Sequence, residues 1–135
     1  MHSKAVLTQT EVARMLAAAR TEAQHNQWAV SIAVVDDGGH PLALERLDGC
    51  SPASAYIALE KARTSALGRR ESKVYEEMIN GGRTAFLSVP LLSATLEGGV
   101  PVLVDGQVVG AVGVSGVRSD QDAQVARAGV QAIAE

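Results

Sequence analysis

Aromatic side chains are scarce in this sequence. They make up 3% of its 135 residues, and the whole set is Trp28, Tyr56, Tyr75 and Phe86. The core must therefore be built from Val, Leu, Ile and Ala, with backbones that approach one another closely. Hydrophobic residues make up 47% of the chain and charged residues 20%. This balance is typical of a globular protein and excludes wholesale disorder.

Cysteine and long apolar runs are also nearly missing. Cys50 is the only cysteine, so an internal disulfide is excluded and a reducing compartment is expected. No apolar run reaches the roughly 18 residues that a membrane span needs. The first residues lack the continuous apolar segment of a signal peptide. The sequence therefore predicts a cytoplasmic protein without a membrane segment.

Positive charge is not in excess. The 12 Lys and Arg residues are outnumbered by 15 Asp and Glu, and the net charge is −3 at pH 7. There is no basic stripe with interleaved aromatic residues, so nucleic acid is not an expected partner. The three histidines are not paired at helical spacing and form no Cys/His cluster, which argues against a structural zinc site.

The clearest local pattern is the stretch from Gly98 to Gly116. Asp105-Gly106 separates two runs rich in valine, which is the strongest short-range signal for a β-hairpin. The second run is apolar or small throughout, so we predict a central strand that is covered on both faces. Its glycines have no side chain to pack, and we expect a helix, another backbone or a ligand to lie close to them.

Apolar residues at helical spacing predict four helices. Thr8 and Glu11 form a capping box at the start of the first helix, and we expect Ser119, with Asp122, to cap the last one. The second helix carries a stripe of alanines, which allows close packing against the glycine-bearing strand. The expected helices lie at about residues 8–25, 51–67, 72–80 and 119–133.

Five strands are expected in addition, two around the turn at 36–39 and two in the hairpin at 98–116. Pro41 cannot donate to a ladder, so the strand that contains it begins there or lies at a sheet edge. The remaining strand is a short one near Leu92–Leu96. The order α, β, β, α, α, β, β, β, α predicts one α+β domain over residues 1–135. In this domain a single antiparallel sheet is covered by helices, in a PAS- or profilin-like style.

Four side chains are candidate site residues. His40 follows a charged turn, and we consider a ligand-binding or catalytic role for it beside simple solvation. His25 lies near the end of the first helix, where a histidine usually meets the helix dipole; the alternative is an iron ligand. Arg46 suits a carboxylate or a propionate, or else a surface ion pair. Lys61, on the small-residue side of its helix, is either a cation that is buried or at the rim of a pocket, or an ordinary solvated lysine.

Three segments of the chain carry a more specific pattern: SIAVVDDGGHPLALERLDG at 31–49, IALEKARTSAL at 57–67, and GGVPVLVDGQVVGAVGVSGVRSDQDAQVARAG at 98–129. They resemble the GlcG/HbpS-like family, which includes the C-terminal domain of PduO-type proteins. The resemblance implies a five-stranded antiparallel sheet flanked by helices, and homo-oligomers that are often dimers assembled into octamers. It also implies haem binding, in some members through a histidine on the first helix, where this chain offers only His25.

Two functional hypotheses follow. The first is a haem- or small-ligand-binding protein, with an imidazole on the iron and Arg46 or Lys61 on the propionates. The second is a small-molecule enzyme of a catabolic operon, namely an isomerase, tautomerase or hydrolase acting on a small carboxylate. In that enzyme His40 is the general acid or base, and Arg46 and Lys61 hold the carboxylate. A third hypothesis is an assembly or chaperone-like partner that has no ligand-binding or catalytic site of its own.

The irregular segment around Pro90 bears on assembly. It carries four apolar side chains, Leu87, Val89, Leu91 and Leu92. A domain this small is expected to cover them with a symmetry mate, so we predict a homo-oligomer of at least two subunits.

Overall fold

A four-stranded antiparallel sheet forms the centre of the computed structural model, which describes residues 1–134. The strand order is β2-β1-β4-β3. The strands are β1 (Ser31–Asp36), β2 (Pro41–Arg46), β3 (Gly99–Val104) and β4 (Gln107–Ser115). The predicted α+β class with a single antiparallel sheet flanked by helices is therefore confirmed.

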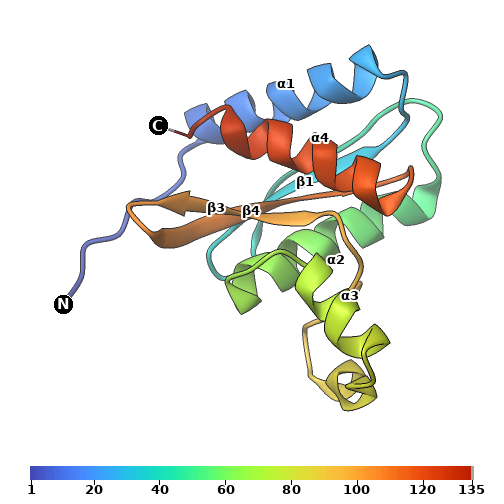
Figure 1. The fold of residues 1–135 in the computed structure, drawn as a ribbon. Coiled ribbons are helices and arrows are strands. Elements are labelled where there is room, and N and C mark those ends of the chain that lie inside the picture. The colour runs from blue at the N-terminus through green and yellow to red at the C-terminus, as the bar shows by residue number, and fades with distance from the viewer. Residues whose placement is uncertain (135) are drawn as a thin grey trace.

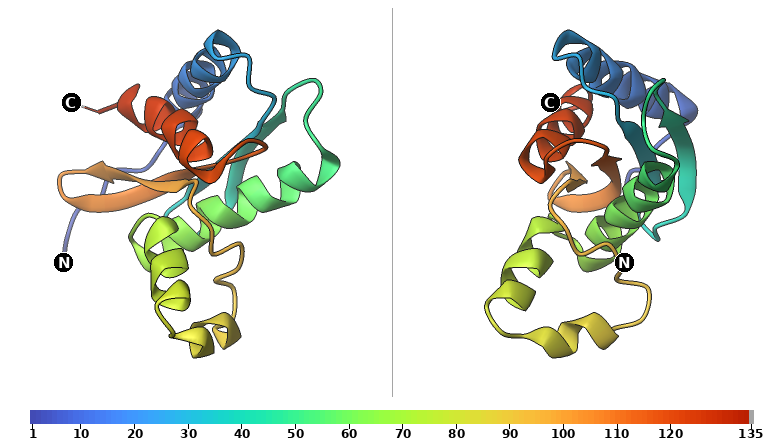
Figure 2. Two further views of the ribbon diagram at one scale, coloured as in Figure 1. Left: turned by 45° about the vertical axis from the view of Figure 1, so that its right-hand side comes forward. Right: turned by 90° about the vertical axis from the view of Figure 1, so that its right-hand side faces the viewer.

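Helices cover both faces of this sheet (Figure 1). Two helices, α1 and α4, lie side by side on one face, and α2 lies on the other. A short helix, α3, and a 3-10 helix, η1, project away from the sheet, as the two views in Figure 2 show. The bounds are α1 (Gln9–His25), α2 (Pro52–Gly68), α3 (Lys73–Asn80), η1 (Thr84–Ser88) and α4 (Ser119–Gln131). No helix in residues 1–134 is both long and apolar enough to cross a membrane.

The expected fifth strand near Leu92–Leu96 is wrong. Leu91 and Ala94 have positive φ angles of 69° and 48°, which are incompatible with a strand. The carbonyls of Ser93 and Leu96 accept hydrogen bonds at 2.6 Å from the hydroxyls of Thr64 and Ser72, respectively. The backbone of this segment is thus bonded by side chains of α2 and of the residue before α3, rather than by a ladder.

The hairpin at Asp105-Gly106 and its central strand are confirmed. Both turn residues have positive φ, 51° and 75°, as the type I′ turn requires. β4 pairs with β1 on one side and β3 on the other, and its residues 108–115 are all buried. The strand therefore lies in the middle of the sheet with both faces covered.

Glycine lets α2 approach this central strand closely. A Cβ atom on Gly113 would overlap the carbonyl oxygen of Ala58 and lie 2.5 Å from the amide nitrogen of Ala62. On β3, a Cβ on Gly99 would overlap the carbonyl of Lys61. The small residues that face one another at this interface are Ala33, Ala58, Ala62, Ala66 and Ala111. The predicted packing of the alanine stripe against the glycine-bearing strand is observed.

The cap predicted for the first helix is confirmed, whereas the cap predicted for the last helix is wrong. In α1 the amide of Thr8 donates to Glu11 at 3.0 Å, as the capping box predicts. In α4 the N-cap is Arg118, whose amide donates to the Gln121 side chain at 3.3 Å. Ser119 is therefore inside the helix, and Asp122 is directed into the core instead of capping it.

Candidate functional site

The four candidate residues do not form one site. His40 lies at the turn between β1 and β2, whereas Arg46 ends β2 and His25 ends α1. Six residues of extended chain separate His40 from Arg46, or about 20 Å at 3.3 Å per residue. Lys61 belongs to α2 and is buried, with 3% of its side chain exposed. His40, Arg46 and Lys61 therefore mark three separate places, and His25 lies outside all of them at the end of α1.

At the first place, Asp36 fixes the imidazole of His40. Oδ1 of Asp36 accepts hydrogen bonds from the amides of Gly38 and His40, both at 2.9 Å, and lies 3.0 Å from Nδ1 of the His40 ring. A carboxylate only accepts, so Nδ1 is the protonated ring nitrogen. In the neutral ring this leaves the lone pair on Nε2, and 77% of the side chain is exposed.

The turn that carries His40 is held from two sides. A Cβ atom on Gly38 would lie 2.8 Å from Cε1 of His40, so the ring occupies the space that the glycine leaves. Lys4 pairs with Asp37 at 2.8 Å, and this hydrogen bond lowers the pKa of the Asp37 carboxyl. Arg69, which follows α2, donates to the carbonyl of Asp37. The imidazole is therefore presented by a fixed backbone.

Apolar and cationic groups lie near this turn. Leu42 and Leu44 on the edge strand β2 are 42% and 47% exposed. The Arg63 side chain packs beside Gly39, where a Cβ atom would lie 2.7 Å from its Cγ. The structure gives its guanidinium no hydrogen bond or ion pair within residues 1–134. Sequence reasoning did not single out Arg63, because its place depends on how α2 lies under the hairpin.

The second place is a groove of about 490 Å³ between the end of α1 and the end of β2. Arg20 of α1 donates twice to Glu45 of β2, at 2.5 and 2.6 Å, and this pairing lowers the pKa of the Glu45 carboxyl. His25 is exposed and does not line the groove, although the preceding residue does. The lining residues are Arg20, Gln24, Gln27, Trp28, Ala29, Glu45, Arg46, Leu47 and Asp48.

The third place is a buried ion pair between α2 and α4. Nζ of Lys61 lies 3.1 Å from Asp122 and donates to the carbonyl of Val114 at 3.0 Å. The other carboxylate oxygen of Asp122 accepts from the amide of Val117. Burial raises the pKa of Asp122, while Lys61 opposes that change. Lys61 thus joins α2 to the end of β4 and to α4, and its predicted role in ligand binding stays a prediction.

A bare metal ion has no prepared site here. Among residues 1–134, no group of three or more His, Cys, Asp or Glu side chains lies close enough to hold one. A porphyrin supplies four nitrogen ligands of its own, so it needs from the protein only an axial ligand, an apolar surface and cations for its propionates. The groups around His40 meet these requirements.

Comparison with known proteins identifies relatives along the whole chain. The chain is 64% identical over 115 residues to protein GlcG of Escherichia coli strain K12, covering 85% of each sequence. The crystal structure of HbpS superposes with a TM-score of 0.91 and 29% identity, covering all of this chain and 95% of that one. A crystal structure of a PduOC–haem complex superposes with a TM-score of 0.85 and 25% identity, covering 96% of each chain.

These similarities agree with the segments that resemble the GlcG/HbpS-like family. The family model for the haem-degrading protein HbpS-like matches residues 7–131, which include the whole sheet and all the helices that cover it. The chain belongs to the HbpS-like family.

Proposed function

We propose that this protein binds haem and that His40 supplies the axial ligand to its iron. The observation that carries the proposal is the hydrogen bond from Nδ1 of His40 to Asp36, which leaves Nε2 available at the surface. A carboxylate behind the ring fixes its tautomer and makes the other nitrogen a better ligand. The PduOC–haem complex, a relative of the same fold, supports haem as the ligand.

The neighbouring side chains suit the rest of the molecule. Leu42 and Leu44 present apolar surface on the edge strand, against which a porphyrin face can pack. Arg63 approaches the turn from α2 and carries a guanidinium that matches a propionate. Bound haem supplies an iron centre for ligand or redox chemistry, and these residues bind, orient and shield it.

A second copy of the chain would complete this site. His40 is not in a closed cavity, and the groove walls described above do not include it. A haem held on this surface by one subunit leaves its outer face in water. We therefore propose that haem lies between two subunits, in agreement with the homo-oligomer predicted from the sequence.

Hemin titration tests both the ligand and the residue. We expect the unaltered protein to shift the Soret band of hemin to that of a histidine-ligated haem. His40→Ala abolishes this spectrum, and Asp36→Asn weakens affinity and changes the Fe–His stretch of the ferrous form. His25→Ala is the matched control, because His25 is an exposed imidazole for which the part of the chain described here provides no carboxylate partner.

The outcomes separate the proposals. An unaltered protein that leaves the hemin spectrum unchanged removes haem binding. If hemin binds and only His25→Ala abolishes the histidine-ligated spectrum, haem binding stands and the ligand is His25, the residue that sequence reasoning favoured.

The enzyme alternative receives less support from the geometry. It requires His40, Arg46 and Lys61 around one carboxylate, and within one subunit these residues lie at three separate places. Catalysis on a small carboxylate would therefore need a different set of residues.

A further inference from the structure

We propose that residues 1–7, which we call the arm, position the turn that carries His40, with Lys4 and Leu7 as the two positioning residues. The arm runs from the start of α1 past β4 to the turn between β1 and β2. The inference deepens the proposed function, because this turn presents the proposed haem ligand. Only its consequence for haem rests on that function.

Lys4 attaches the arm to the turn. Its Nζ lies 2.8 Å from Oδ2 of Asp37, and the two side chains are 31% and 47% exposed. Asp37 directly follows Asp36, the residue that orients the His40 ring. The backbone at Asp37 thus belongs to the loop that holds the imidazole, and Lys4 restrains that loop from outside it.

Leu7 attaches the arm to the sheet. Its side chain is partly buried and packs against the core between the sheet and the helices α1 and α4. A Cβ atom on Gly110 would lie 2.6 Å from Cδ1 of Leu7, so the leucine uses the space that this glycine leaves. Gly110 on β4 is the direct partner of Asp36 on β1. Leu7 therefore covers the strand pair at the residue whose carboxylate holds His40.

Few other contacts hold the arm. Within residues 1–134, the bond from Lys4 to Asp37 is the only hydrogen bond that residues 1–7 make. An exposed ion pair contributes up to about 1 kcal/mol, and a fully buried leucine about 1.5–3 kcal/mol. Ordering the backbone costs about 1–2 kcal/mol per residue. The arm is therefore marginally attached, and the turn has a restrained state and a freer state that are close in free energy.

Hydrogen exchange at the turn tests the inference in the protein without haem. The amides of Gly38 and His40 donate to Asp36 at 2.9 Å, so their exchange rates measure how often the loop opens. We expect Lys4→Ala to speed this exchange by about threefold and Leu7→Ala by about tenfold, while the amides of β4 keep their rates. Lys4→Arg keeps the ion pair and should keep the unaltered rate.

Two exposed side chains provide matched controls. Val6→Ala changes an arm side chain that is 80% exposed, and Lys73→Ala removes an exposed ion pair on α3. Neither should alter exchange at the turn. Molar salt should mimic Lys4→Ala in the unaltered protein, because it screens an exposed pair. Unaltered rates at the turn in both Lys4→Ala and Leu7→Ala overturn the inference. Equal acceleration of the amides of β4 also overturns it, because the arm would then stabilise the whole sheet.

The consequence for haem is measured separately. Hemin bound through His40 should leave Lys4→Ala about threefold faster than it leaves the unaltered protein, with apomyoglobin as the acceptor. An exchange effect without any hemin binding removes the proposed function and leaves the role of the arm intact. Hemin bound through His40 without an exchange effect in either variant removes the role of the arm and leaves the proposed function intact.

Discussion

A single buried charge pair fixes three elements relative to one another. Lys61 and Asp122 are both 3% exposed, and each makes a further hydrogen bond to the backbone, at Val114 and Val117. A charge in such a place is stable only while its partner is present. The pair therefore stabilises the arrangement of α2, β4 and α4 rather than acting as a reactive group.

Removing one member should be costly. We expect Lys61→Met to lower the free energy of unfolding by about 3–5 kcal/mol, because it leaves the Asp122 carboxylate buried without a cation. Lys61→Met combined with Asp122→Leu should cost less than Lys61→Met alone. Urea denaturation followed by circular dichroism measures both.

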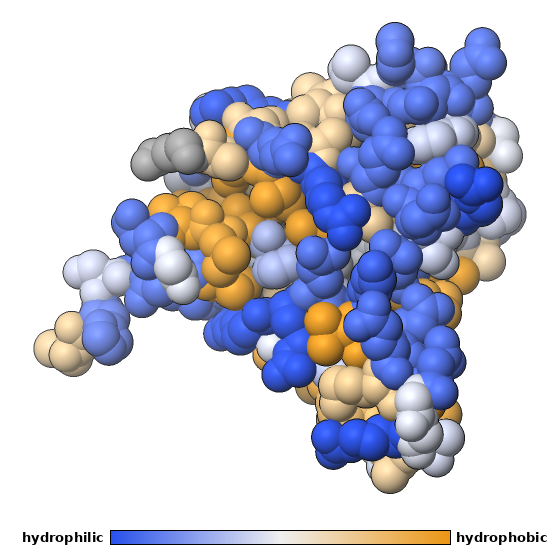
Figure 3. Space-filling model, viewed as in Figure 1, coloured by the Kyte–Doolittle hydropathy of each residue, from blue (hydrophilic) through white to orange (hydrophobic). Residues whose placement is uncertain are grey.

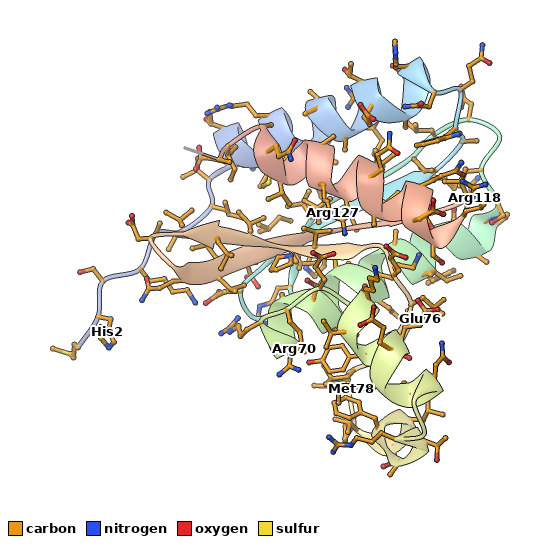
Figure 4. The ribbon with its side chains drawn as sticks, in the orientation of Figure 1. His2, Arg70, Glu76, Met78, Arg118 and Arg127 are labelled. Atoms are coloured by element: carbon orange, nitrogen blue, oxygen red, sulfur yellow. The ribbon has the colours of Figure 1, made fainter. Side chains whose placement is uncertain are left out.

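The Arg127–Glu71 pair provides the control for this measurement. Its atoms are 2.7 Å apart, but its side chains are 42% and 37% exposed. Arg127 is labelled on α4 in Figure 4, above the connection between α2 and α3. Arg127→Met should cost no more than about 1 kcal/mol. Equal losses of unfolding free energy for Lys61→Met and Arg127→Met would show that the buried pair stabilises the fold no more than the exposed pair does.

Sequence reasoning assigned the wrong partner to Asp122. A carboxyl three residues after Ser119 fits a helix-capping pattern, and that local pattern was the only signal available. The true partner is 61 residues away in sequence and becomes visible only when α2 and α4 are placed at the same end of the sheet. Lys61 itself was noticed, because it lies on the small-residue side of α2, and burial was one of the alternatives considered for it; only its partner could not be identified from the sequence.

Close packing of α2 on the central strand is the main feature at the level of elements. The alanine stripe and Gly113 leave no room between the two backbones. Gly113→Ala should therefore cost more than the usual 1–3 kcal/mol of an overpacked core, about 3 kcal/mol or more, since only backbone movement can make room. Thermal or urea unfolding measures this loss.

Gly81→Ala is the matched control for this change. Gly81 ends α3 with a φ of −79°, and the nearest atom that a Cβ would meet is 3.1 Å away. Its loss should stay below about 1 kcal/mol. A Gly113→Ala protein as stable as Gly81→Ala would show that α2 can move away from the sheet freely.

Strong local patterns predicted most elements, and one weak pattern misled. The capping box of α1, the alanine stripe of α2 and the Asp105-Gly106 hairpin each depend on neighbouring residues, so the sequence alone identifies them. The segment Leu92–Leu96 is apolar enough for a strand, but its carbonyls bond to the side chains of Thr64 and Ser72. Those distant hydroxyls cannot be paired with it from the sequence.

The arrangement of the candidate site residues could not be predicted from the sequence either. The sequence identified His40 and Arg46 as chemically notable, and they prove to lie at opposite ends of β2. The bond between Asp36 and His40 spans only four residues, and the charged turn before His40 was the signal that singled this histidine out, although the sequence did not show which carboxylate contacts the ring. Arg63 gave no such signal, because only the packing of α2 brings it to the turn.

At the scale of the whole molecule, the projection formed by α3, η1 and the following segment exposes apolar side chains. Leu87, Val89, Leu91 and Leu96 are 64%, 37%, 69% and 42% exposed. In Figure 3 orange and pale orange atoms appear among blue ones on this projection. A small chain gains by covering such a surface with a copy of itself.

We therefore predict an oligomer that depends on this projection. Light scattering at micromolar concentration should give a mass of at least two subunits, and Leu91→Glu should shift it towards the monomer. Leu103→Glu is the control, since Leu103 is also exposed, at 58%, but lies on β3. A monomer mass for the unaltered protein would contradict the prediction.

The strand order also determines when the sheet can be completed during synthesis. β1 pairs with β4, so residues 31–36 find partners at 110–115. A nascent chain released from the ribosome only as far as η1 has one edge of β1 exposed and lacks the central strand β4, which supplies much of the surface on which α2 packs. Such distant pairing makes folding slow and exposes strand edges to other chains. The last third of the polypeptide must therefore emerge before the first third is protected.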